Sequence, residues 1–316
     1  MLLHAPAILS FGMNYDEMLG FIRDFQHYRY TPGATGHGGN FVVDLADVEA
    51  IDLDAALVLV AEYHRGVADR PGYRPPIDDV GWPAWVRCLL EQLGFYELVK
   101  PSARSSDSLD DVAFDHRFVP FVTARDVQGV LVDGLIERLK AAAGATPKRI
   151  ATYGALLEAI KNVKNHAYPQ DAEPQLPTRV EQWWGAGAYV PEERTLAFAM
   201  YDQGVGIPAT LPKRPIWEAI RRLCPPEFND ADVIGGAIEL GRTSTGKLER
   251  GNGLWTICSL VRELPGSHVR ILSGRGELSF ASDGTYQKQL HAKPFCGTLI
   301  EWSLVLPLEG PVGVPS

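Results

Sequence analysis

Residues 153–169 read YGALLEAIKNVKNHAYP, and the apolar residues of this stretch recur with the period of an amphipathic helix. Glu158, Asn162 and His166 are spaced four residues apart, so they lie along one face of the predicted helix. A carboxylate, an amide and an imidazole in line suit either a solvated stripe or the wall of a ligand site. Taken alone, these residues leave both interpretations open.

Two later segments combine glycines with polar groups. LAFAMYDQGVGIP, at 196–208, is a predicted strand that ends in Asp202 and continues into Gly204 and Gly206. Glycines allow a ligand to approach the backbone closely, and an Asp can accept a hydrogen bond from an exocyclic amine. GRTSTGKLERGNGL, at 241–254, leads into an apolar helix whose first N–H groups favour an anion. The simpler alternatives are an Asp-initiated turn and a flexible linker with a helix cap.

In this order the segments resemble the ATPase domains of the GHKL superfamily, which unites gyrase, heat-shock chaperone, histidine kinase and mismatch-repair proteins. EAIKNVKNHA resembles the N box, DQGVGIP the first glycine box, GNGL the second, and CGTLIEW at 296–302 the closing strand. The resemblance covers about residues 112–307 and is strongest to anti-sigma-factor serine kinases and histidine kinases. It implies a Bergerat-type two-layer α/β sandwich, in which helices cover one face of a mixed sheet.

The resemblance also implies ATP and Mg²⁺ as ligands, and roles for the matched residues. Glu158 is the expected catalytic base, Asn162 the Mg²⁺ ligand, and Asp202 the group that reads the adenine amine. Residues 208–250 correspond to the ATP lid, with short helices predicted near 216–223 and 232–240. The other expected cofactor-binding residues are His166, Gly204, Gly206, Ile207, Thr245, Lys247, Gly251, Asn252, Gly253, Leu254 and Thr298.

The first hundred residues predict alternating strands and helices. Strands are expected at 7–11 and 41–45, and helices at 15–28, 54–65 and 82–93. FVVDLADVEAIDLDAALVL, at 41–59, resembles the central motif of STAS domains, and RCLLEQLGFYEL, at 87–98, resembles their closing helix and strand. The polar stretch 101–111 predicts a linker. We therefore expect an α/β protein with a STAS-like domain and linker at 1–110 and the ATPase domain at 111–316.

Asp54 occupies the position at which phosphorylatable STAS domains carry their acceptor serine. Two hypotheses follow. Either the carboxylate partly imitates phosphoserine, so that this domain serves docking or assembly, or Asp54 caps the helix that begins at residue 55.

Composition limits the partners and the location of the chain. A length of 316 residues with 46% hydrophobic content can fill the cores of two domains. The net charge of −9 argues against nucleic acid or an acidic membrane as the main partner. The four cysteines lack CxxC spacing, the opening MLLHAPAILSFGM lacks the cationic start of a signal peptide, and no apolar run has the length of a membrane span. A cytoplasmic location is expected.

These observations predict an ATP-binding protein that hydrolyses ATP slowly with Mg²⁺ and couples its nucleotide state to a protein partner, with a homodimer as one arrangement. Two alternatives stay open. One is a protein serine/threonine kinase that acts on a separate STAS-type partner, and the other is a nucleotide-gated binding module with little turnover.

Overall fold

The structure is a computed structural model. It describes residues 1–31, 41–70, 72–102, 112, 114–144, 148–173, 176, 179–243 and 252–307. The expected Thr245, Lys247 and Gly251 lie outside these residues, as does nearly all of the predicted linker at 101–111.

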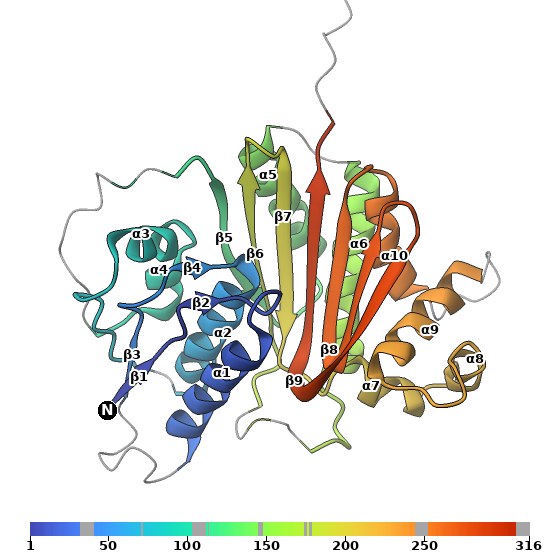
Figure 1. The fold of residues 1–316 in the computed structure, drawn as a ribbon, viewed down its shortest axis with the longest axis horizontal. Helices are drawn as coiled ribbons and strands as arrows, with labels where there is room; N and C mark the ends of the chain where they lie inside the picture. The colour runs from blue at the N-terminus through green and yellow to red at the C-terminus, as the bar shows by residue number, and fades with distance from the viewer. Residues whose placement is uncertain are drawn as a thin grey trace, which may run out of the picture.

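A five-stranded sheet forms the centre of the molecule, with strand order β5-β6-β7-β9-β8 (Figure 1). Every neighbouring pair in this sheet is antiparallel, so the expected mixed sheet is wrong. Its strands are β5 (Arg117–Ala124), β6 (Trp183–Val190), β7 (Thr195–Asp202), β8 (His268–Ala281) and β9 (Tyr286–Val305). In the β7–β9 register, Asp202 lies opposite Thr298.

Helices cover both faces of the sheet, which corrects the expectation that one face is covered (Figure 1). Neighbouring residues of β7 show why. Phe198 and Met200 enter the core beneath one set of helices, whereas Ala199 and Tyr201 enter the core shared with the N-terminal residues. Side chains alternate along a strand, so a strand that is apolar at consecutive positions is buried on both sides.

The first helical layer lies on the face that carries Phe198. It contains the predicted 153–169 helix, which is divided into α6 (Arg149–Asn162) and a single π-helical turn (Val163–Ala167). The other helices on the C-terminal side are α5 (Gly129–Ala143), α7 (Ile207–Thr210), the 3₁₀ turn Leu211–Lys213, α8 (Trp217–Arg221), α9 (Asp230–Thr243) and α10 (Gly253–Arg262). The helices predicted near 216–223 and 232–240 are thus confirmed as α8 and α9.

The second layer comes from the N-terminal residues, which form short parallel strand pairs and four helices. β1 (Leu2–His4) pairs with β3 (Val42–Asp44), and β2 (Ile8–Leu9) pairs with β4 (Ala50–Ile51). The helices are α1 (Tyr15–Tyr30), α2 (Leu53–Asp69), α3 (Ala84–Gln92) and α4 (Phe95–Val99). The closing strand expected within 87–98 is wrong, because residues 95–99 are helical.

Asp54 joins this layer to the sheet. Its side chain is 1% exposed and forms an ion pair with Arg270 of β8, which also contacts Glu301 at 2.9 Å. Burial and the nearby Glu301 carboxylate raise the pKa of Asp54, while Arg270 opposes that rise. The capping hypothesis is wrong, since α2 begins after Asp52 and Asp54 lies inside its first turn. Because Asp54 is buried and paired with Arg270, its carboxylate is not accessible to a protein partner in this conformation.

Candidate nucleotide site

The π-helical turn places the end of the N-box helix against the first glycine loop. The carbonyl of Ala167 accepts a hydrogen bond from the Val205 N–H at 2.9 Å. A Cβ added to Gly204 would lie 2.3 Å from the same carbonyl oxygen, so only glycine fits there. Asn162 ends α6 and His166 lies in the turn, and both line one cavity. Turns of this kind are frequent at functional sites, and residue spacing did not predict this one.

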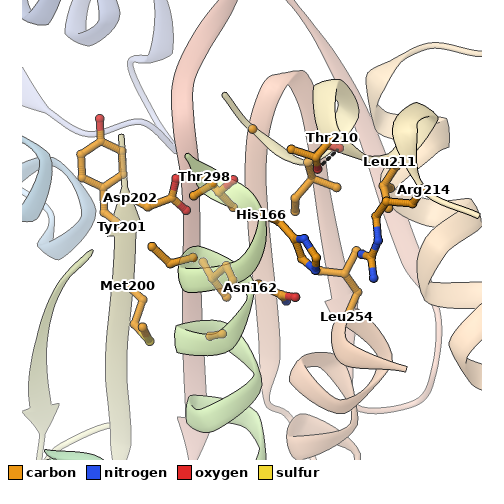
Figure 2. Close-up of a pocket in the computed structure, with 16 residues that line it drawn as sticks. Asn162, His166, Met200, Tyr201, Asp202, Thr210, Leu211, Arg214, Leu254 and Thr298 are labelled. Atoms are coloured by element: carbon orange, nitrogen blue, oxygen red, sulfur yellow. Dashed lines mark hydrogen bonds between the residues drawn. The ribbon is translucent and has the colours of Figure 1, made fainter. Parts of the chain in front are cut away.

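Asp202 lies at the deep end of the cavity, beside Thr298 (Figure 2). It is 6% exposed, and its Oδ1 accepts a hydrogen bond from the Gly204 N–H at 2.8 Å. Burial raises the pKa of the Asp202 carboxyl to about 7, although hydrogen bonds from the Gly204 and Thr298 backbone oppose the rise. Met200 and Ile300 supply apolar walls. This end offers a planar, largely apolar ligand one buried acceptor.

Ser273 and Gly297 contact the residues at the deep end, and sequence reasoning did not identify Ser273. The Ser273 Oγ lies 3.0 Å from Thr298 Oγ1 and accepts a hydrogen bond from the Ile207 N–H at 2.9 Å. Gly297 has a φ of +87°, and a Cβ there would lie 1.8 Å from the Asp202 carbonyl oxygen. The Gly-Thr pair was expected at the closing strand, but only the strand register shows that its glycine lets Thr298 reach Asp202.

Beside α10 the cavity adjoins a larger space, which has a more polar lining. The deep part has about 600 Å³ of space and the open part about 1850 Å³, both including space open to solvent. Asn162, His166 and Leu254 line both parts. A Cβ on Gly253, the first residue of α10, would lie 3.3 Å from Glu158 Oε2 and 3.4 Å from Asn162 Oδ1. The N box and the second glycine box are therefore in contact.

The open end offers donors that suit an anion and an acceptor that suits a cation or a donor group. The first N–H groups of α10 have no partner within the helix, as at any helix start, and they belong to the lining residues Gly253 and Leu254. Within the described residues, the buried Asn252 Oδ1 has no hydrogen-bond partner. A ligand with both acceptor and donor groups, or a bound cation, would complement this end.

Arg214 was not expected at the site, yet it lines both parts of the cavity (Figure 2). Its guanidinium forms no ion pair with any described residue, and burial lowers its pKa. Burial also lowers the pKa of His166, and the nearby Arg214 cation lowers it further, so His166 is neutral at pH 7. Nothing in the segment 208–250 singled out this arginine, because it lies in no motif.

Most of the expected site residues meet in this cavity. Asp202, Thr298, Gly206 and Ile207 line its deep part, Glu158, Asn252 and Gly253 line its open part, and Asn162, His166 and Leu254 line both. Glu158 forms a 2.9 Å ion pair with Lys161. Gly204 lies behind the cavity against Ala167 and lines a neighbouring recess instead. In the described ranges, no group of three or more His, Cys, Asp or Glu side chains is arranged to hold a metal ion.

No protein-family model, curated protein or solved structure matches the chain. Within the described ranges, every helix is too short or too polar to traverse a lipid bilayer.

Proposed function

We propose that the chain binds ATP in this cavity with Mg²⁺, hydrolyses it slowly, and couples its nucleotide state to a protein partner or an assembly. The observation that carries the proposal is the layout of the cavity. A buried carboxylate acceptor lies between apolar walls at one end, and the start of α10 lies at the other. Arg214, which forms no ion pair with any described residue, lines both parts. An adenine base and a polyphosphate have this same polarity along their length.

Asp202 supports the choice of adenine. Its Oδ1 accepts a hydrogen bond from the Gly204 N–H, and the Thr298 backbone also donates to the carboxylate. A carboxylate offers about four acceptor positions, so Asp202 can still accept a hydrogen bond from an exocyclic amine. A buried carboxylate gains more from a donor than an exposed one, because no water competes for it. Guanine carries a carbonyl oxygen where adenine carries its amine. With guanine, this oxygen and the Asp202 carboxylate would face each other, and both are acceptors.

Asn162, Arg214 and the start of α10 support phosphate binding. The amide oxygen of Asn162 would suit a hard cation such as Mg²⁺, which would neutralise phosphate charge when bound. Asn252 Oδ1, which has no hydrogen-bond partner among the described residues, is a second amide oxygen near this end. Arg214 is free to meet a phosphate because no described residue neutralises it. These groups fit an Mg²⁺ ion that takes most of its ligands from the nucleotide and few from the protein.

Glu158 supports hydrolysis and also suggests why it would be slow. It lies against Gly253 at the phosphate end, where a carboxylate can orient or deprotonate an attacking water. Its other oxygen is engaged by Lys161 at 2.9 Å, and this cation must move or share the carboxylate before Glu158 acts as a base. The same contact favours, as second candidate, a nucleotide-gated module with little turnover.

The test compares nucleotides that differ in the base. MgATP and MgADP should each raise the melting temperature, because a ligand that binds only the folded state stabilises it by mass action. MgGTP at the same concentration should have little effect. Release of phosphate from ATP then separates the slow ATPase from the gated module. Absence of any shift with MgATP and MgADP would refute the proposal, and equal shifts with MgATP and MgGTP would refute the role of Asp202.

A further inference from the structure

A buried polar contact joins the N-terminal helices to the residue that follows Asp202. Glu62 of α2 is 0% exposed, and its Oε1 accepts a hydrogen bond from Gln203 Nε2 at 2.9 Å. Gln26 of α1 donates to the same oxygen at 2.8 Å, and Arg65 donates to Oε2 at 2.6 Å. Both members of the Glu62–Arg65 pair have completely buried side chains.

This arrangement fixes Glu62 firmly. A buried carboxylate is costly unless it is paired and hydrogen-bonded, and the three donors meet that requirement. The guanidinium of Arg65 is itself placed by the ring of Tyr30, whose centroid lies 4.2 Å from Cζ. Glu62 is therefore a rigid acceptor at the surface of α2 that faces the sheet.

Gln203 lies just after β7, in the first glycine box, and both its side chain and its backbone form hydrogen bonds. Its side chain donates to Glu62, and its backbone N–H donates to the Tyr168 hydroxyl at 3.0 Å. The Tyr168 hydroxyl in turn donates to the Gln182 carbonyl at 2.7 Å. Asp202 and Gly204, on either side of Gln203, form the hydrogen bond that orients the carboxylate in the cavity. Fixing Gln203 thus limits how far Asp202 can move.

We propose that Glu62 and Gln203 are positioning residues for Asp202, and that they couple the adenine site to the packing of α2 on the sheet. The inference rests on the proposed function, since it assumes that Asp202 reads adenine. Nucleotide binding stabilises the packing of α2 on the sheet. In turn, a well-packed α2 raises the affinity for nucleotide. Coupling between two binding events is reciprocal, so each strengthens the other by the same factor.

The first test is the variant Gln203→Met, which keeps the length of the side chain and removes the donor to Glu62. The side-chain oxygen of Gln203 is buried without a partner among the described residues, so its removal leaves no donor unpaired. Loss of the amide nitrogen takes one donor from Glu62, which keeps Gln26 and Arg65. We expect the dissociation constant of MgADP, measured by calorimetry, to rise about tenfold, within the usual range of coupling between sites. The kcat at saturating MgATP should change by less than about twofold, because Glu158 and Asn162 are untouched.

The matched control is Tyr15→Phe. It removes a different hydrogen bond between the N-terminal helices and the sheet, from the Tyr15 hydroxyl to the Lys293 carbonyl at 2.8 Å, and neither residue lines the cavity. The stacking of the ring on His291 is kept. MgADP affinity should stay within about twofold of wild type, since no contact to Gln203 is lost. An equal loss of affinity in both variants would overturn the specific role of Gln203.

The second measurement is hydrogen exchange with and without MgADP, in wild type and in Gln203→Met. MgADP should slow hydrogen exchange in α2, residues 53–69, of the wild-type chain, and this effect should disappear in Gln203→Met. Wild type that fails to bind MgADP refutes the proposed function. Wild type that binds MgADP while α2 exchanges at an unchanged rate, or a Gln203→Met variant with wild-type affinity, overturns this inference and leaves the proposed function standing.

Discussion

Replacing Asp202 by Asn should separate nucleotide binding from stability. Asn has the same shape and can still accept the hydrogen bond from the Gly204 N–H. Its amide nitrogen, however, carries two donors and would face the adenine amine, which is also a donor. The substitution also removes the buried negative charge. We therefore expect Asp202→Asn to lose MgATP and MgADP binding and to become more stable without nucleotide.

The size of the stability gain follows from the pKa of Asp202. Burial raises that pKa from an ordinary 3.8 to about 7. This rise is worth up to about 4 kcal/mol, at about 1.4 kcal/mol for each tenfold change in the protonation equilibrium. Because the folded pKa is raised, the contribution of Asp202 to stability is fully present below pH 3.8 and is lost as the pH rises to about 7.

The variant should therefore exceed wild type most clearly at high pH. We expect a gain in the free energy of unfolding of up to about 4 kcal/mol at pH 8, and about 2 kcal/mol at pH 5. Urea unfolding of both proteins at the two pH values measures the gain, and calorimetry with MgADP measures binding. Asp54 titrates in both proteins, so its effect cancels. A variant that binds MgADP like wild type, or that is less stable than wild type at pH 8, would refute the reasoning.

Three other changes test separate parts of the structure. Glu158→Gln should retain MgATP binding and reduce phosphate release by about 100-fold, the usual range for a general base; unchanged turnover would favour the gated module. Gly297→Ala should destabilise the chain by at least about 3 kcal/mol in urea, because its Cβ would lie 1.8 Å from the Asp202 carbonyl oxygen, and a loss below about 1 kcal/mol would contradict that geometry. Arg270→Met should cost about 3–5 kcal/mol, since it leaves the buried Asp54 without its cation; a wild-type unfolding curve would show that the ion pair contributes nothing.

Residue spacing predicted the secondary structure of two segments that line the candidate site. The period of the apolar residues places Glu158 and Asn162 on α6, and the strand that ends in Asp202 is β7. Helix period and strand alternation depend on neighbouring residues, so a linear sequence carries them. The π-helical turn at His166 was not predictable, because it depends on a hydrogen bond between Ala167 and Val205.

By itself the sequence determined most of the helices and strands, although not the helix at residues 95–99, and it showed which segments carry polar groups and glycines. Only the tertiary structure decided that the sheet is antiparallel throughout, that the N-terminal helices cover its second face, and that Arg214 lines the cavity. It also decided that Glu62 meets Gln203, which is 141 residues away along the chain. Such contacts depend on burial against distant segments and on donors that complete a buried carboxylate, and no local period records either of them.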